Sequence, residues 1–447
     1  GYRYASGVWA PSIRAHDGRL YVYFPTPTEG IFMTSAPRAA GPWTPPVQVI
    51  AGPGLEDPCP FWDDDGRAYL IHSRVGAGPL ILHRMSPDGR KVLDAGRVIV
   101  DDPVHLPTLE GPKLYRKDGY YYIFAPYGGV DHGSEAVLRA RNIYGPYEYR
   151  TVLSQGATRV QGPHQGAYVE TPSGQGWFIH FNSTGPYGRI VYLEPVRWRD
   201  GWPIIGELRP GATVGQPVQS YTAPDVGHAD PAIHPQTSDE FTGSKLGPQW
   251  EWNHNPAAGG WSLTARPGFL RLRALSAPDL VSARDTLTQM LQARDEEVTT
   301  RLALAGMADH QKAGLAMFGV QPSWIGVVQR HGRRYVAFSE AGRETLGQRL
   351  GASGPATGRT QAESASGAET GFVELRMRVA DGRVRYSYSL DHGRTFHPLG
   401  KRAVMRFSWW KAARPALFTF DTEAHAARGG SADFDWVRVR LLSRTSP

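Results

Sequence analysis

The sequence predicts an all-β protein in which a β-propeller is followed by a β-sandwich. Three observations support this prediction. Strand-like segments recur around a turn glycine at intervals near fifty residues, a stretch rich in proline and glycine interrupts them after residue 206, and a second series of strand-like segments follows. An interval of this length is typical of a four-stranded propeller blade.

The repeat is clearest at its turn glycines. Gly18, Gly66, Gly119 and Gly174 are separated by 48, 53 and 55 residues. The first three each follow an aspartate, and Asp-Gly between apolar segments is a strong signal for a β-hairpin. We therefore expect four blades between residue 8 and about residue 206, within a propeller domain of residues 1–206.

The second half of the chain is expected to hold a separate β domain. Residues 207–238 are rich in proline, glycine and small polar residues and lack strand alternation, which predicts a linker. Residues 239–447 are expected to form a β-sandwich. Its clearest predicted strands are residues 270–274, 297–302, 313–318, 325–328 and 372–379.

Composition narrows the classes of partner. The chain of 447 residues carries a net charge of +7, but its lysines and arginines are scattered singly among acidic residues, so we expect no nucleic-acid partner. No apolar run approaches the roughly 18 residues of a membrane-spanning helix, so we expect no membrane partner. The single cysteine, Cys59, excludes an intrachain disulfide and leaves the compartment open between the cytoplasm and the secreted or periplasmic space.

Acidic and aromatic motifs open the repeats. The segment Val8-Trp9-Ala10-Pro11-Ser12-Ile13 opens the first repeat, Glu56-Asp57-Pro58 opens the second, and Leu109-Glu110-Gly111-Pro112 opens the third. In a propeller the openings of successive innermost strands point to one central pocket. We therefore expect Asp57 and Glu110 to lie on the floor of one pocket at the propeller axis.

These motifs, in this order, resemble the five-bladed propellers of glycoside hydrolase family 43. The resemblance also rests on Gly162-Pro163-His164-Gln165-Gly166, on Gly188-Arg189 and on the closing Asp433-Phe434-Asp435-Trp436. The whole chain resembles the β-xylosidase or α-L-arabinofuranosidase type with a C-terminal concanavalin-like domain. The resemblance implies a five-bladed propeller, of which four blades are visible in this sequence.

The resemblance implies a catalytic role for two carboxylates. Glu110 matches the family's general acid, and Asp57 matches the carboxylate that orients that acid and adjusts its pKa. Inversion needs an acid that protonates the leaving oxygen and a base that deprotonates a water across the ring. The acid needs a raised pKa, which a neighbouring carboxylate and an apolar pocket supply.

No general base is named. In the family it is an aspartate in the first blade, which precedes the Trp-Ala-Pro motif by some tens of residues, and the sequence begins six residues before Gly7. We expect a further stretch to supply that blade; the alternative is a four-blade remnant or a binding derivative. Asp230, in a segment that resembles a blade opening in miniature, is a weaker candidate.

Three further residues match positions of the family. Arg189 matches an arginine that binds the sugar; the alternative is a surface residue of the blade. Trp9 matches an aromatic residue that stacks on the sugar; the alternative is a core residue. His164 matches a histidine that binds calcium or its water shell on the propeller axis. An alternative of equal weight is that the His164 ring hydrogen-bonds to carbonyl groups of the inner strands, because calcium prefers oxygen ligands to a ring nitrogen.

Two functions remain open. The first is an exo-acting, inverting glycosidase that releases terminal β-xylose or α-L-arabinofuranose from plant cell-wall oligosaccharides, because a pocket capped by a second domain admits only chain ends. The second is a non-catalytic carbohydrate-binding protein that lacks the base. Both imply an oligosaccharide partner, a possible structural Ca²⁺ and no organic cofactor, and both leave oligomerisation open.

Overall fold

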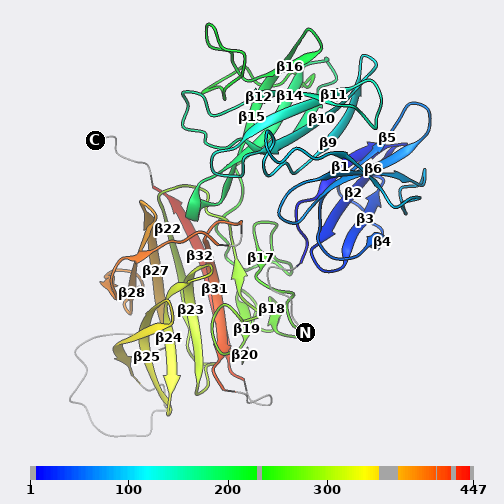
Figure 1. Cartoon of the computed structure of the whole chain (residues 1–447). Helices are drawn as coiled ribbons and strands as arrows, with labels where there is room; N and C mark the ends of the chain where they lie inside the picture. The colour runs from blue at the N-terminus through cyan, green and yellow to red at the C-terminus, as the bar shows by residue number, and fades with distance from the viewer. Residues whose placement is uncertain (1–6, 229–233, 352–370, 409, 424–428, 443–447) are drawn as a thin grey trace, which may run out of the picture. The chain divides into compact units, whose positions relative to one another are not determined.

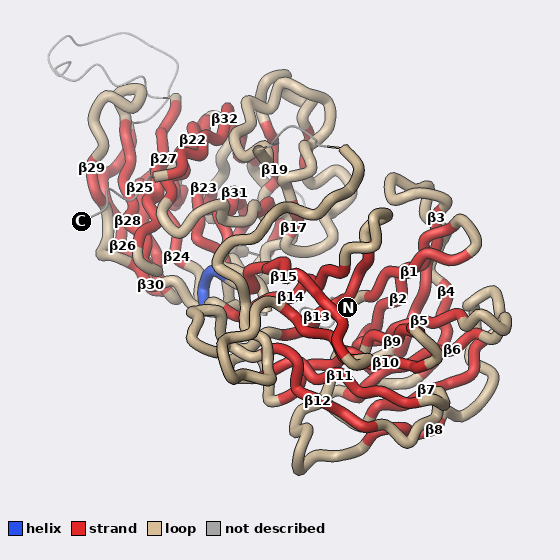
Figure 2. Tube along the Cα trace, turned by 90° about the horizontal axis from the view of Figure 1, so that it is seen from above, coloured by secondary structure: helices blue, strands red, loops and turns tan. Residues whose placement is uncertain are grey.

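The computed structural model describes residues 7–228, 234–351, 371–408, 410–423 and 429–442. They form strands and loops, and the one helical element among them is a 3₁₀ turn, η1 (Gly185–Tyr187), drawn blue in Figure 2. The chain divides into two compact units. The first comprises Gly1–Ser183 and Arg189–Pro231, and the second comprises Thr184–Gly188 and Ala232–Pro447.

The first unit contains four antiparallel sheets of four strands, each built from consecutive strands (Figure 1). The first two sheets are β1 (Ser12–His16), β2 (Arg19–Thr26), β3 (Gly30–Ala36), β4 (Val47–Ala51) and β5 (Leu55–Trp62), β6 (Ala68–Arg74), β7 (Leu80–Met85), β8 (Arg97–Val100). The next two are β9 (Lys113–Lys117), β10 (Tyr120–Tyr127), β11 (Ser134–Ala140), β12 (Glu148–Leu153) and β13 (His164–Glu170), β14 (Gly176–Ser183), β15 (Arg189–Arg199), β16 (Trp202–Ile205). The predicted arrangement of four blades is confirmed.

The predicted hairpin turns join the first two strands of the blades. Asp17 and Gly18 have φ values of 45° and 69°, and Asp118 and Gly119 have values of 48° and 75°. Two successive residues with positive φ are characteristic of the type I′ turn, whose twist matches that of the strands it joins. Asp-Gly is favoured there because glycine adopts positive φ without steric cost and aspartate tolerates it.

Apolar layers between neighbouring sheets hold the blades together. One layer joins the first and second sheets around Tyr23 and Leu70, and the next joins the second and third sheets around Ile71 and Ile123. A third layer joins the third and fourth sheets around Phe178. The first strands of the sheets also meet, since β5 contacts β1 and β9, and β9 contacts β13. Residues at the openings of these strands are thereby brought together.

The fourth sheet carries an exposed apolar face. Ile179 pairs with Leu193 across β14 and β15, and the two side chains are 44% and 41% exposed. Val191 and Val169, two residues along on the same face, are 66% and 48% exposed. On the first sheet Ile13 is 54% exposed. Exposed apolar faces of this kind are expected where a further sheet packs, and a fifth blade stays a prediction.

The second unit is a β-sandwich of two eight-stranded sheets. One sheet contains β17 (Glu251–Trp252), β20 (Leu275–Ser276), β21 (Leu287–Thr288), β23 (Gln311–Phe318), β24 (Ser323–Arg330), β25 (Arg333–Glu340), β26 (Arg343–Leu350) and β31 (Arg414–Asp421). The other contains β18 (Trp261–Ser262), β19 (Leu270–Arg273), β22 (Glu296–Ala303), β27 (Phe372–Ala380), β28 (Arg383–Ser389), β29 (His397–Pro398), β30 (Ala403–Val404) and β32 (Ser431–Leu441). One buried cluster with members from both sheets, Ile325 and Phe434 among them, fills the space between them, as expected of a sandwich.

The predicted linker contacts the fourth sheet, since Val218 N donates to Glu194 Oε2 of β15 at 2.8 Å. Glu207 forms a β-bridge with Gln216, whose side chain is buried and donates to Glu207 Oε1 at 2.8 Å. Residues 229–233, which include Asp230, lie outside the described residues. No helix in the described part of the chain is long and apolar enough to cross a membrane.

Candidate functional site

Three carboxylates from two neighbouring blades meet where the first strands of those blades lie side by side. Glu56 and Asp57 lie in β5, and Glu110 lies three residues before Lys113, the first residue of β9. One carboxylate oxygen from each lies within 4.8 Å of the others. Within the described ranges this is the one group of three or more acidic, histidine or cysteine side chains that lie so close together.

A β-bulge brings Asp57 to this group. The pairing of β5 with β6 shifts between Glu56 and Cys59, and Asp57 has a φ of 53°, in the left-handed region. The side chain is buried, and its Oδ2 accepts hydrogen bonds from Gly111 N at 2.9 Å and Gln165 Nε2 at 2.8 Å. Burial raises the pKa of Asp57, while Lys113 and these hydrogen bonds oppose the shift.

The side chain of Glu110 is held by the fourth blade, and its backbone by the third. Its Oε1 lies 3.0 Å from His164 Nε2, and its Oε2 lies 3.4 Å from Gln165 Nε2. Its backbone N–H donates to Pro126 O at 3.1 Å. The side chain remains 22% exposed, so an incoming oxygen atom can reach the carboxyl group. This combination of fixed orientation and access suits a proton donor.

A buried lysine lies behind the two carboxylates. Lys113 Nζ donates to Gly111 O at 3.2 Å, next to the amide that donates to Asp57. Burial lowers the pKa of Lys113, and neighbouring acidic groups including Asp57 oppose the shift. The charge of Glu135 also opposes the lowering of the Lys113 pKa. Neither of the buried carboxylate oxygens of Glu135 has a hydrogen-bond partner among the described residues. Burial raises the pKa of Glu135 well above its usual value.

Arg189 lies at the start of β15, near the carboxylates. Its guanidinium carbon is 4.5 Å from the centre of the Phe181 ring. Burial lowers the pKa of Arg189, while Glu110, Asp57 and Asp131 oppose the shift. In the described part of the chain its buried Nε has no acceptor, so a donor is available for a ligand oxygen.

The donor set around His164 does not fit a calcium site. His164 is fully buried, its Nε2 is engaged by Glu110, and its Nδ1 has no partner within the described ranges. Calcium takes six to eight oxygen ligands, and His164 does not belong to the three-carboxylate group. The contact that the structure gives to His164 is with Glu110, the predicted acid.

The remaining sequence candidates are less constrained. Trp9 is half-buried, and its backbone N–H donates to Pro25 O at 3.0 Å. Its contact with a sugar stays a prediction.

The three-carboxylate group does not identify a general base. An inverting acid and base stand roughly 6.5–9.5 Å apart, which leaves room for the attacking water. One oxygen of Asp57 and one of Glu56 lie within 4.8 Å of a Glu110 oxygen. The general base therefore stays unassigned.

Two residues of the site were missed as functional candidates although they lie in the recognised motifs. Gln165 donates to both Asp57 and Glu110, and its φ of 53° matches that of Asp57. Gly111 allows this approach, because a Cβ there would lie 2.8 Å from Gln165 Oε1. Glu56, beside Asp57, is the other missed residue, and its burial is the first cause of a pKa raised to about 8.

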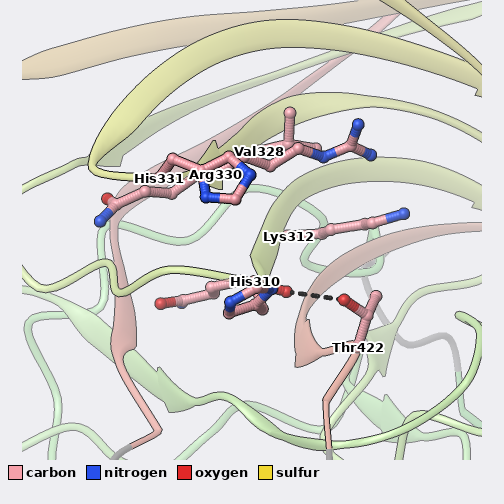
Figure 3. A pocket seen from close by; sticks show the side chains of 8 residues that line it. His310, Lys312, Val328, Arg330, His331 and Thr422 are labelled. Atoms are coloured by element: carbon pink, nitrogen blue, oxygen red, sulfur yellow. Dashed lines mark hydrogen bonds between the residues drawn. The ribbon is translucent and has the colours of Figure 1, made fainter.

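A pocket in the second unit has different chemistry. Figure 3 shows His310, Lys312, Arg330 and His331 around it, with Thr422 Oγ1 donating to His310 O at 3.2 Å. None of the eight residues that line this pocket is a carboxylic acid. It therefore offers no pair of carboxyl groups, and we place the candidate site at the three carboxylates.

A propeller that presents buried and accessible carboxylates at the openings of its inner strands has the kind of groups that glycoside hydrolases use for acid catalysis. The model named Glycosyl hydrolases family 43 matches residues 2–203, and the model named Beta xylosidase C-terminal Concanavalin A-like domain matches residues 238–440. The chain belongs to glycosyl hydrolase family 43.

The names of similar proteins support the family assignment. A protein of Xylanibacter ruminicola that is named for β-xylosidase activity is 41% identical over 93% of this chain and 74% of its own length. A β-xylosidase of Formosa agariphila is 32% identical over 97% of this chain and 78% of its own length. A non-reducing end α-L-arabinofuranosidase of Bacteroides ovatus is 32% identical, but over 60% of this chain and 52% of its own length.

Solved structures agree with the fold. A bifunctional GH43-CE protein of Bacteroides eggerthii superimposes with a TM-score of 0.82 at 27% identity, covering 98% of this chain and 55% of that chain. The GH43 BlXynB protein of Bacillus licheniformis superimposes with a TM-score of 0.81 at 24% identity, covering 98% and 87%. The all-β propeller followed by a concanavalin-like domain, predicted from the sequence, is therefore confirmed.

Proposed function

We propose that this chain acts as an exo-acting, inverting glycosidase that releases a terminal pentose, β-xylose or α-L-arabinofuranose, from plant cell-wall oligosaccharides. The observation that carries the proposal is the pairing of a partly exposed Glu110 with a buried Asp57, both held by Gln165. The names of the relatives from Formosa agariphila and Bacteroides ovatus support a pentose as the released sugar.

In the proposed reaction Glu110 gives its proton to the glycosidic oxygen as that oxygen leaves the anomeric carbon. A water molecule attacks the same carbon from the opposite face and loses a proton to a general base, so the released sugar has the inverted configuration. Asp57 and His164 orient Glu110, and Arg189 supplies donors to sugar hydroxyls. We propose that the base is an aspartate on a fifth blade that covers the exposed apolar faces of the first and fourth sheets.

The test uses three substrates. We expect nitrophenyl β-xyloside or nitrophenyl α-L-arabinofuranoside to be hydrolysed, and xylotetraose to release xylose and xylotriose first, as expected of exo action. Proton NMR of the first xylose released from a β-xyloside should show the α-anomer. The β-anomer would refute inversion, and xylobiose as the first product would refute exo action. If calorimetry shows that xylotetraose binds and none of the three substrates is hydrolysed, the enzyme hypothesis is rejected in favour of a non-catalytic carbohydrate-binding protein.

A further inference from the structure

Asp57 and Glu110 lie close enough to share a proton. One carboxyl oxygen of each lies within 4.8 Å of the other. Two carboxyl groups at this separation resist ionising together, so over a range of pH the pair holds one proton. Burial raises the pKa of Glu56, the third carboxyl group, to about 8, so Glu56 is mostly neutral below that pH. In the proposed reaction the shared proton must lie on Glu110, which gives it to the glycosidic oxygen.

Burial alone would place the shared proton on Asp57 instead. Asp57 is only 4% exposed, whereas the side chain of Glu110 is 22% exposed. A carboxyl group withdrawn from water loses more hydration on ionising, so burial favours a neutral Asp57 and an ionised Glu110. Arg189 does not reverse this preference, since its interaction with Glu110 is stronger than that with Asp57. The proton arrangement that the reaction needs therefore depends on another group.

Lys113 is a cation placed to reverse the preference. It is the first residue of β9 and is 7% exposed. Among the groups that favour the ionised form of Asp57, Lys113 has the largest effect, ahead of the hydrogen bonds from Gln165 and Gly111. Asp57 in turn favours the charged form of Lys113. Because both groups are withdrawn from water, each has a strong effect on the charge of the other.

Three other strands supply the remaining groups that act on Lys113. Cys59 from β5 and Glu135 from β11 favour its charged form, and Arg14 from β1 opposes that form. Burial raises the pKa of Glu135 well above its usual value, so Glu135 is mostly neutral and is a poor partner for a buried ammonium group. Asp57 has hydrogen-bond donors for its charge, so it is the ionised partner of Lys113.

Hydrogen bonds connect this charge pair to the backbone beside the acid. Gly111 N donates to Asp57 Oδ2 at 2.9 Å, and Lys113 Nζ donates to Gly111 O at 3.2 Å. Gly111 directly follows Glu110 and has a φ of 58°, in the left-handed region. Asp57 and Lys113 therefore hold both polar backbone groups of the residue next to Glu110.

We propose that Lys113 is a positioning residue that directs the proton shared by Asp57 and Glu110 to Glu110, because its ammonium group keeps Asp57 ionised and Gly111 in place. Without the ammonium group Asp57 retains the proton at a buried position, and Glu110 is left ionised and unable to act as the acid. The inference rests on the proposed glycosidase function.

The first test compares Lys113→Met with the parent on two substrates that end in the same pentose, an oligosaccharide and a nitrophenyl glycoside. Methionine retains a long unbranched side chain and removes the charge. Because general acid catalysis contributes about 10²–10⁴-fold, kcat/KM for the oligosaccharide should fall by about 10²-fold. A nitrophenolate leaves without a proton, so kcat/KM for the nitrophenyl glycoside should fall by less than about fivefold.

Lys117→Met is the matched control. Lys117 lies in the same strand, is 31% exposed and pairs with Glu170 at 2.9 Å. This variant should keep kcat/KM for both substrates within about twofold of the parent, as expected for a surface ion pair. Equal losses on the two substrates in a folded Lys113→Met protein, or no loss on either, would overturn the proposal.

A double-mutant cycle tests whether Lys113 acts through Asp57. Asparagine at position 57 cannot take the proton from Glu110, so adding Lys113→Met to Asp57→Asn should lower kcat/KM for the oligosaccharide by less than about threefold further. A further loss of about 10²-fold would show that Lys113 acts independently of Asp57 and would overturn the proposal.

A third measurement does not depend on hydrolysis. In a protein labelled with ¹³C at the aspartate carboxyl carbons, the resonance that is missing from Asp57→Asn identifies Asp57. In the parent it should report an ionised carboxyl group at about pH 6, and in Lys113→Met it should titrate at least about one pH unit higher.

The spectra separate the proposal from the proposed function. A protonated Asp57 in the active parent would overturn the proposal even if Lys113→Met does not fold, and so would the same titration in the parent and the variant. A parent that shows the ionised Asp57, with the expected shift in Lys113→Met, but hydrolyses no pentoside would retain the effect of Lys113 on Asp57 and reject the proposed function.

Discussion

Replacing Glu110 by alanine tests the proposed proton donor apart from the other parts of the site. The side chain contacts His164 Nε2 at 3.0 Å and Gln165 Nε2 at 3.4 Å and is 22% exposed. Its removal therefore deletes a carboxyl group at the open side of the cluster and leaves the buried apolar layers intact. The loss of activity should depend on how much the leaving group needs a proton.

The expected magnitude differs between two substrates. General acid catalysis contributes about 10²–10⁴-fold. Xylobiose has a sugar alcohol as its leaving group, so Glu110→Ala should lower its kcat/KM by about 10³-fold, which is about 4 kcal/mol in the barrier. A nitrophenyl xyloside releases a stable phenolate without protonation, so its kcat/KM should fall by less than about tenfold, or about 1.4 kcal/mol.

The assay is steady-state kinetics on both substrates, together with thermal unfolding to confirm that the variants fold. Glu110→Gln retains the shape of the side chain and should lose activity on xylobiose as alanine does, because an amide cannot give up the proton. Glu148→Gln serves as the control for a lost surface carboxylate. Equal losses on the two substrates, or a glutamine variant that hydrolyses xylobiose normally, would refute the assignment of Glu110 as the acid.

Three further outcomes are expected. Arg189→Lys should raise KM for xylobiose about tenfold with a smaller effect on kcat, because lysine lacks the paired donors of a guanidinium; an unchanged KM would contradict the sugar contact. Gly166→Ala should lower the free energy of unfolding by about 1–3 kcal/mol, since a Cβ there would lie 1.7 Å from Phe178 Cζ; an unchanged midpoint in urea would contradict this. In the second unit burial opposes ionisation of Asp433, but hydrogen bonds from Arg271 and a second arginine outweigh it and lower its pKa. Its stabilisation should be present above the unfolded-state pKa of about 3.9 and be lost as the pH falls through the lower folded-state value. Asp433→Asn should remove this pH dependence and cost about 2–4 kcal/mol at neutral pH; thermal unfolding at several pH values measures both, and a variant as stable as the parent would contradict the role of the ion pair.

The sequence was sufficient to predict the repeating part of the fold. Turn glycines such as Gly18 and Gly119 recur at blade intervals and have the positive φ that the hairpins need. Strand segments of the sandwich were also found where predicted, for example residues 313–318 in β23 and 372–379 in β27. These features depend on local turn chemistry and alternation, which a single sequence displays directly.

The site was predicted in part. Motif order led to Asp57 and Glu110, and the structure brings their carboxyl groups within 4.8 Å at the nearest oxygens. The contact between His164 and Glu110 was not predicted, because the two residues are 54 positions apart and meet only when the third and fourth blades pack. The general base stays unassigned.

Two bulges explain why the rest of the site could not be predicted from alternation. In a regular strand Glu56 and Asp57 would diverge, as would His164 and Gln165. The pairing shifts after Glu56 in β5 and after His164 in β13, and in each case the second residue of the pair, Asp57 or Gln165, has a φ of 53°. Holding a residue other than glycine in this region costs of order 1–3 kcal/mol, and the packing of the blades has to offset that cost. As a result, each of these two strands places two consecutive side chains at the three-carboxylate cluster. Glu56 and Asp57 of β5 are members of the cluster, and His164 and Gln165 of β13 contact it. A site of two carboxylates, as the motifs alone suggest, is thereby extended to three carboxylates with their own hydrogen-bond donors.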